Sequence, residues 1–99
     1  MLTSRQKSHL AGLAQTLEPQ IQLGKGGPSA GLVSQLDRIL ADHELVKLRF
    51  VDFKESRQEL ATELASSTKS ELVRVIGNVA VLFRRNPDPK KRKIDFGDL

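Results

Sequence analysis

Residues 71–83 read Glu-Leu-Val-Arg-Val-Ile-Gly-Asn-Val-Ala-Val-Leu-Phe, and this stretch decides the fold. Only Gly77 and Asn78 separate two runs of strand-forming residues, a spacing that predicts a tight β-hairpin. The second run, over 79–84, is the most uniformly apolar of the expected strands. A strand that is apolar on both faces belongs inside a sheet, so we expect 79–84 to be a central strand antiparallel to 71–76.

Upstream of the hairpin, apolar spacing predicts three helices that alternate with two further strands. The helices are expected from Thr3 or Ser4, over about 29–42, and from a capping box of Ser56 and Glu59. The first helix is expected to carry on one face Leu10, Leu13, Ala14 and Leu17. The strands are expected over about 20–23 and 45–51.

Chirality then fixes the topology. Right-handed β-α-β crossovers that step in one direction place the second and third helices on the same face of the sheet. The predicted fold is therefore an α+β two-layer sandwich in the order α-β-α-β-α-β-β. Its sheet has four strands, is mixed, and has the strand order 1-2-4-3.

The composition indicates one small domain. A chain of 99 residues buries roughly two-thirds of its unfolded surface. The absence of cysteine excludes disulfides and thiolate metal sites. No apolar run approaches the ~20 residues of a membrane span, and no secretory signal opens the chain. We therefore expect a cytoplasmic protein without a membrane partner.

The residues Gly24, Lys25, Gly26 and Gly27 (the GKGG loop) lie between the first expected strand and the second expected helix. Glycines remove the Cβ atoms that would hold a ligand away from the backbone, and the helix that follows directs unpaired N–H groups toward the loop. Such a loop suits an anion such as a nucleic-acid phosphate, as in the GXXG loop of KH domains. The alternative is a plain strand-to-helix turn. Because the GxxxxGK[ST] motif is absent, a mononucleotide site is not expected.

Positive charge is concentrated near the end of the chain. Residues 84–93 hold six Lys or Arg and one Asp, whereas residues 1–83 carry a balance of only +1. Such a segment can bind polyanions, although the alternative is a solvated tail. Its prolines and charges predict a flexible tail over 87–99, behind a domain over 1–86. The candidate RNA-binding residues are Gly24, Lys25, Gly26, Gly27, Arg5, Lys7, Arg38, Lys47, Arg49, Arg84, Arg85, Lys90, Lys91, Arg92 and Lys93.

No pattern in the sequence indicates catalysis. His9 and His43 lack the neighbours that a metal site or a catalytic triad requires, so we expect no enzyme, no metal and no cofactor. The chain has no Trp or Tyr, and Phe50 and Phe83 are expected in the core. Few rings are then left for base stacking, which favours recognition of the backbone and shape of structured RNA. The affinity for RNA should depend strongly on salt.

Several segments in register resemble the bacterial YhbY proteins, which are stand-alone CRM domains. They are residues 2–7, the GKGG loop, residues 43–47, and the hairpin from Ile76 to Leu82 with the Lys-Arg-Lys tail. The resemblance covers essentially the whole chain. It implies an RNA-binding domain shaped like the C-terminal domain of translation initiation factor 3. It also implies association with immature large (50S) ribosomal subunits, where a monomer would contact 23S ribosomal RNA.

Two functions remain open at this point. The first is a non-enzymatic RNA-binding factor in large-subunit assembly. The second is a small protein-interaction or regulatory adaptor that binds polyanions nonspecifically. The placement of charge distinguishes them: a contiguous face formed by the GKGG loop, the start of the first helix and the tail favours RNA, whereas sites that point apart favour the adaptor.

Overall fold

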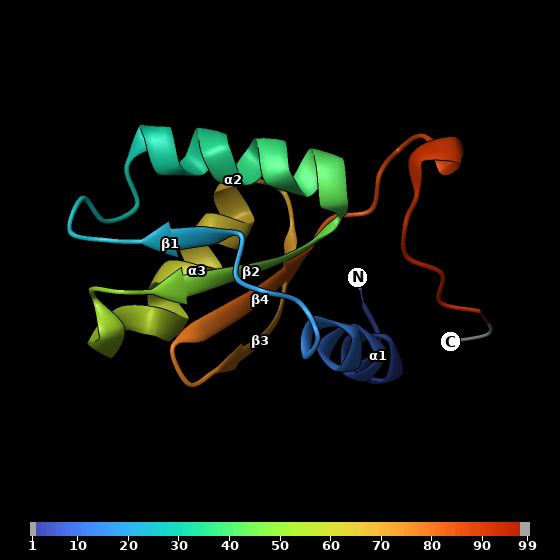
Figure 1. The fold of residues 1–99 in the computed structure, drawn as a ribbon, viewed down its shortest axis with the longest axis horizontal. Coiled ribbons are helices and arrows are strands. Elements are labelled where there is room, and N and C mark those ends of the chain that lie inside the picture. Colours follow the sequence, from blue (N-terminus) through green and yellow to red (C-terminus); the bar gives the residue numbers. More distant parts are fainter. Residues whose placement is uncertain (1, 98–99) are drawn as a thin grey trace.

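The hairpin at residues 71–83 forms as predicted and organises the sheet. The computed structural model describes residues 2–97 (Figure 1). Strands β3 (Glu71–Ile76) and β4 (Val79–Phe83) are antiparallel, and a positive φ of 56° at Gly77 permits the two-residue turn. On its other side β4 pairs antiparallel with β2 (Leu45–Phe50), which pairs in parallel with β1 (Ile21–Leu23). The order β1-β2-β4-β3 confirms the prediction.

Two of the three α-helices begin at a side-chain N-cap that the sequence predicts. Helix α1 (Ser4–Ala14) starts with a capping box of Thr3 and Gln6, and α2 (Ala30–His43) follows Ser29, whose hydroxyl accepts from the Leu32 N–H. Helix α3 (Arg57–Ser67) is instead entered through a 3-10 turn, η1 (Lys54–Ser56). Ser56 therefore has φ −107° and ψ 19° and makes no side-chain cap, so the predicted capping box with Glu59 is wrong.

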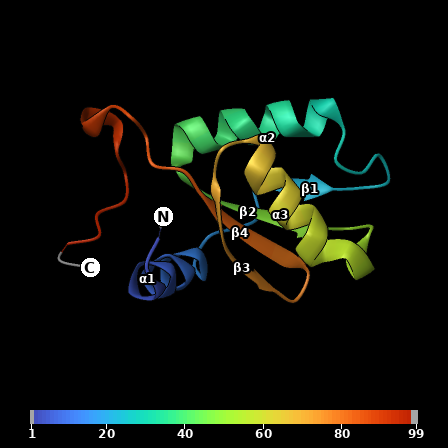
Figure 2. The same ribbon diagram turned by 180° about the vertical axis from the view of Figure 1, so that it is seen from behind.

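Helices α2 and α3 cover one face of the sheet, as the two-layer prediction requires (Figure 2). The buried residues of this layer come from both helices and from alternate positions of the strands. They are Leu36, Leu40, Ala61, Leu64 and Ala65 of the helices, and Val46, Leu48, Phe50, Ala80 and Leu82 of the central strands. Their burial supplies the main hydrophobic stabilisation of the domain.

Helix α1 covers part of the opposite face, a position that the sequence pattern does not indicate, so α1 and α2 lie on opposite sides of the sheet in Figure 1. Leu10, Ala11 and Ala14 pack there against the strand residues Leu45, Val73, Val81 and Phe83. This second layer explains why β4 is apolar on both faces. Leu13 was expected in the core, but it lies beside the buried stripe of α1 and its side chain is 39% exposed.

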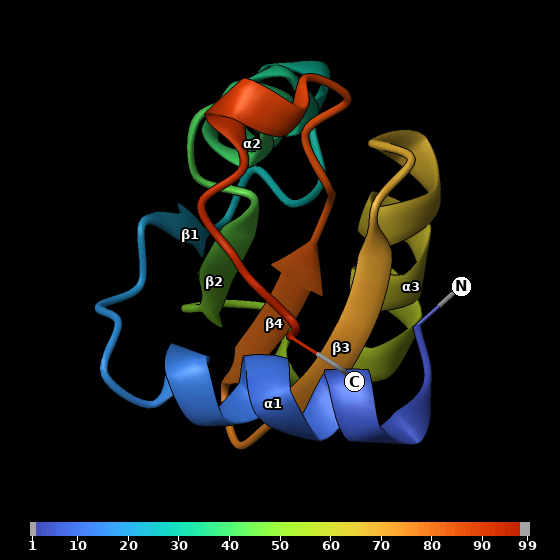
Figure 3. The same ribbon diagram turned by 90° about the vertical axis from the view of Figure 1, so that its right-hand side faces the viewer.

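The predicted tail, of which residues 98 and 99 lie outside the described residues, makes contacts with the rest of the domain. Residues 87–97 (the C-terminal segment) include a 3-10 turn, η2 (Pro89–Lys91), and run from the end of α2 toward α1 (Figure 3). The ring of Phe96 is buried edge-on against Phe83, with 5.5 Å between ring centroids. His9 on α1 contacts the Asp95 carbonyl at 3.2 Å. The segment is therefore held by packing contacts that local composition does not reveal.

Glu44, between α2 and β2, is the polar anchor of the C-terminal segment. Its carboxylate is buried and accepts hydrogen bonds from the backbone N–H groups of Asn86 (2.6 Å), Lys93 (2.6 Å) and Ile94 (3.2 Å). Hydrogen bonds to a charged acceptor are stronger than neutral ones, which makes this a firm attachment.

In the part of the chain that the structure describes, no helix is long and apolar enough to cross a membrane.

Candidate nucleic-acid interface

The GKGG loop is a tight turn that links β1 to the N-terminus of α2. The Gly27 N–H donates to the Gly24 carbonyl at 3.0 Å, and the Ser29 N–H donates to the Gly27 carbonyl at 2.8 Å. Ser29 then caps α2, so the loop is fixed on its helical side. Lys25 and Gly26 are left exposed at the tip of the turn.

The tip of the GKGG loop offers hydrogen-bond donors to an anion. Within residues 2–97, the backbone N–H groups of Lys25 and Gly26 have no hydrogen-bond partner. The first turn of α2, which begins at Ala30, adds further N–H groups and the positive end of a helix dipole nearby. Together with the charge of Lys25, these groups are suited to a phosphate.

Of the three glycines in the loop, only Gly27 is required by the backbone conformation. Gly27 has a φ of 63°, and a Cβ there would lie 3.3 Å from Cε2 of the Phe53 ring. Gly24 and Gly26 have no positive φ, and a Cβ at either would meet none of the described atoms within 4 Å. Gly27 is therefore explained by the turn itself, whereas the open space beside Gly24 and Gly26 is available to a ligand.

This difference predicts opposite effects for two alanine substitutions. Gly27→Ala should lower the free energy of unfolding by about 1 kcal/mol, because alanine is strained at positive φ. Gly26→Ala should leave the thermal unfolding temperature unchanged but weaken binding to RNA, since its methyl group would occupy the space of a phosphate. Thermal unfolding and a binding titration on both variants check this. Loss of stability without loss of binding in Gly26→Ala would contradict a ligand site at the tip.

The candidate cations lie in two groups at opposite ends of α2. The GKGG loop precedes the N-terminus of α2, and the C-terminal segment lies beyond its C-terminus (Figure 1). The 14 residues of α2 separate them by roughly 20 Å. Arg5 and Lys7 on α1 belong to the second group, because α1 contacts the C-terminal segment through His9. Arg38, exposed on α2, lies between the two groups.

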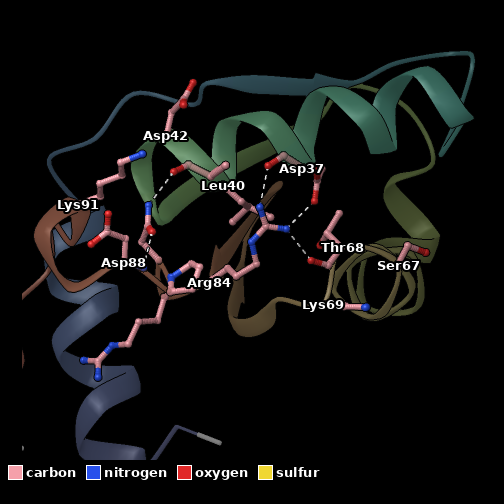
Figure 4. A pocket seen from close by; sticks show the side chains of 13 residues that line it. Asp37, Leu40, Asp42, Ser67, Thr68, Lys69, Arg84, Asp88 and Lys91 are labelled. Atoms are coloured by element: carbon pink, nitrogen blue, oxygen red, sulfur yellow. Dashed lines mark hydrogen bonds and ion pairs between the residues drawn. The ribbon is translucent and has the colours of Figure 1, made fainter.

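Some of the predicted RNA-binding residues are occupied within the protein. Figure 4 shows Arg84 pointing between α2 and the end of α3, where its guanidinium donates to the Asp37 carboxylate (2.5 Å) and to the Thr68 carbonyl (2.8 Å). Lys47 donates to the Leu17 carbonyl, and Arg92 donates to the Asn86 carbonyl. The Arg85 guanidinium lies 5.0 Å from the centre of the Phe96 ring. Arg84 in particular joins α2 to the end of α3.

The remaining candidates are available to a ligand. Within the described chain, their charged groups form no hydrogen bond or ion pair; they are Arg5, Lys7, Lys25, Arg38, Arg49, Lys90, Lys91 and Lys93. Arg49 on β2 is opposite Gln22 of β1, close to the strand end that leads into the GKGG loop. The groove of about 800 Å³ around Arg84 also contains Asp37, Asp42 and Asp88, so it is not a uniform anion site.

The charge criterion from the sequence is met only in part. Helix α1 and the C-terminal segment are adjacent, but the GKGG loop lies at the other end of α2 and does not share a contiguous face with them. A ligand that touches both groups must extend over roughly 20 Å.

Among the described residues, no three His, Asp or Glu side chains gather as metal ligands would.

Phe53 is a neighbour of the GKGG loop that sequence reasoning missed. A Cβ on Gly27 would lie 3.3 Å from its ring, and Phe53 is 42% exposed, whereas Phe50 and Phe83 are buried as predicted. The signal in the sequence was weak: Phe53 stands just outside the alternating strand that ends at Phe50. Only the fold brings it to a loop 26 residues earlier in the chain.

Similar proteins match nearly the whole chain. The family model described as the CRS1/YhbY (CRM) domain matches residues 2–84. The chain is 34% identical over 91 residues to Probable RNA-binding protein PA4753 of Pseudomonas aeruginosa, which covers 91% of this chain and 88% of that protein. It is 34% identical over 92 residues to Probable RNA-binding protein YqeI of Bacillus subtilis, with 92% and 96% covered. The solution structure of the hypothetical protein SAV1595 from Staphylococcus aureus matches with a TM-score of 0.80 and 36% identity, over 96% of this chain and 100% of that one.

Proposed function

Because this chain belongs to the CRS1/YhbY (CRM) domain family, we propose that it is a non-enzymatic protein that binds structured RNA. Relatives that match over most of their length, from Pseudomonas aeruginosa and Bacillus subtilis, each carry the name "Probable RNA-binding protein". The observation that carries the proposal is the tip of the GKGG loop, where two backbone N–H groups without partners flank the charge of Lys25. These donors bind a backbone phosphate, which makes the contact independent of base sequence.

The proposed RNA-binding unit is the domain over residues 1–86, and the C-terminal segment extends its surface. A phosphate backbone that enters at the GKGG loop runs along α2, which carries Arg38, to the C-terminal segment, which carries Lys90 and Lys91. A folded RNA presents phosphates over such a distance, whereas a mononucleotide does not. The separation of the two cation groups is thus compatible with an extended polyanion.

We place this RNA in the 23S ribosomal RNA of immature large (50S) subunits, where the protein acts as a cytoplasmic monomer. The support for this step is the resemblance of residues 2–7, the GKGG loop, residues 43–47 and the hairpin to the YhbY proteins. The excess of positive charge also favours RNA-rich particles, with attachment that weakens as salt is raised.

Charge reversal at the loop tip tests the RNA contact. Lys25→Glu should weaken binding to 23S ribosomal RNA transcribed in vitro by about tenfold, and it should reduce the slope of log K against log salt by about one. The fold should be intact, because Lys25 is exposed and its side chain has no partner within residues 2–97. Lys69→Glu, an exposed charge reversal at the end of α3, is the matched control.

Cation groups that lie apart favour the alternative function, an adaptor that binds polyanions nonspecifically. The control variant distinguishes this adaptor from a protein that recognises RNA through the loop. An adaptor that binds polyanions through total charge loses the same affinity in Lys25→Glu as in Lys69→Glu. A specific loop contact makes Lys25→Glu the weaker binder. Unchanged affinity in Lys25→Glu, with unchanged thermal stability, would remove the GKGG loop from the interface.

A further inference from the structure

The ring of Phe53 is an exposed aromatic surface beside the GKGG loop. Of the four phenylalanines, Phe50, Phe83 and Phe96 are buried, with at most 8% of each exposed, whereas Phe53 is 42% exposed. The edge of its ring lies against Gly27, since a Cβ on that glycine would be 3.3 Å from Cε2 and 3.5 Å from Cζ. One part of the ring thus supports the loop, and another part faces solvent.

The backbone of Phe53 is held in an unfavourable conformation. Its φ of 58° and ψ of 34° lie in the left-handed region, which is rare for a bulky side chain. Two hydrogen bonds fix it there: the Asp52 carboxylate accepts from the Phe53 N–H at 2.8 Å, and the Ser56 N–H donates to the Phe53 carbonyl at 3.0 Å. Full burial of the Phe53 ring could offset this backbone strain, but the ring is partly exposed. Such outliers gather at sites of function.

The surroundings of the ring match the parts of one nucleotide. Gly27, beside the ring, directly follows Lys25 and Gly26, whose unpartnered N–H groups suit a phosphate together with the charge of Lys25, and Lys54 follows Phe53 in the chain. A nucleotide carries a flat base within reach of its phosphate, and aromatic rings stack on bases of any identity. A purely paired helix hides its bases, so this site requires an unpaired one.

We infer that Phe53 is a base-stacking residue, which receives an unpaired base of the nucleotide whose phosphate lies at the tip of the GKGG loop. This inference rests on the proposed RNA-binding function and adds to it. Recognition is then not by backbone and shape alone: the loop selects a junction, bulge or hairpin loop in the RNA, without reading which base is present.

The absence of Trp and Tyr from the chain makes a direct test possible. In Phe53→Trp the single indole reports on the site, and a stacked base quenches its fluorescence. The probes are an RNA stem-loop with an eight-adenosine loop and a blunt RNA duplex with the same number of phosphates. The stem-loop should quench the indole with the same midpoint as its binding curve, and the duplex should quench far less. Ile76→Trp, at a side chain that is 52% exposed at the end of β3 and away from both cation groups, is the matched control and should not be quenched.

Affinity provides the second readout. Phe53→Leu keeps an apolar side chain against Gly27 but cannot stack, so it should weaken binding to the stem-loop by about tenfold and leave binding to the duplex unchanged. If Phe53→Leu binds the stem-loop like the wild type while Lys25→Glu binds it weakly, the stacking role is wrong and the RNA contact of the loop stands. Equal weakening toward both RNAs, with a lower unfolding temperature, would show that Phe53 only supports the loop. If neither variant changes binding, the proposed function fails at this site.

Discussion

Replacing Glu44 with alanine is expected to lower the free energy of unfolding by about 3 kcal/mol. Glu44 is 1% exposed, and its carboxylate accepts from the three backbone N–H groups at positions 86, 93 and 94. Without the carboxylate, those three N–H groups lose their acceptor and can form hydrogen bonds only with water. Water reaches them only if the C-terminal segment detaches from the domain. Phe96 would then lose its burial against Phe83.

Two further variants separate this effect from a general effect of charge. Glu44→Gln keeps the side-chain shape and one acceptor oxygen, so its loss should be smaller than that of Glu44→Ala. Glu63→Ala removes an exposed carboxylate on α3 and should unfold like the wild type. The measurements are denaturant unfolding and the rate of tryptic cleavage within residues 90–93, which should rise in Glu44→Ala. A Glu44→Ala protein as stable and as resistant as the wild type would contradict the anchoring role.

The sheet could be predicted because its signals are local. The two-residue turn at Gly77 and Asn78 fixes the hairpin, and the apolar run of β4 places that strand inside the sheet. Thr3 and Ser29 are good N-caps, and both begin helices where the sequence indicates. Ser56 shows the limit of such signals, since the approach of the chain through η1 prevents it from capping α3.

The second face of the sheet could not be predicted, because its contacts join distant parts of the chain. The bond from the Lys93 N–H to Glu44 spans 49 residues, and the contact of His9 with Asp95 spans 86. Nothing in the neighbourhood of Glu44 marks it as buried, and the charges around Phe96 suggest a solvated tail. The packing of α1 and the C-terminal segment depends on these contacts, so local composition predicts flexibility instead.

The candidate site was predicted at the level of the loop but not of its surroundings. The strand before the GKGG loop and the Ser29 cap after it are both visible in the sequence. The separation of the loop from the Lys-rich segment follows from the direction of α2, which only the fold reveals. Arg84 reads as part of a basic run, yet its guanidinium is directed inward to Asp37 and Thr68.

A variant that loses charge at both ends of α2 should lose nearly all RNA binding. It combines Lys25→Glu with glutamine at Lys90, Lys91, Arg92 and Lys93. Because several phosphate contacts disappear together, the affinity for RNA at physiological salt should fall by roughly 100-fold or more. The fold should persist, because Glu44 holds the backbone N–H of Lys93 and not its side chain. A swap of Lys90→Arg with Arg92→Lys keeps the charge and should bind like the wild type.

Sucrose-gradient fractionation of cell lysates, with detection of the protein in each fraction, tests the central claim most directly. The wild type and the charge-preserving swap should sediment with immature large-subunit particles at moderate salt and be largely absent from mature translating ribosomes. High salt should release them, and the charge-depleted variant should remain at the top of the gradient at moderate salt. A wild-type protein found mainly on small subunits or free at low salt, or a charge-depleted variant that still travels with large-subunit particles, would contradict the account.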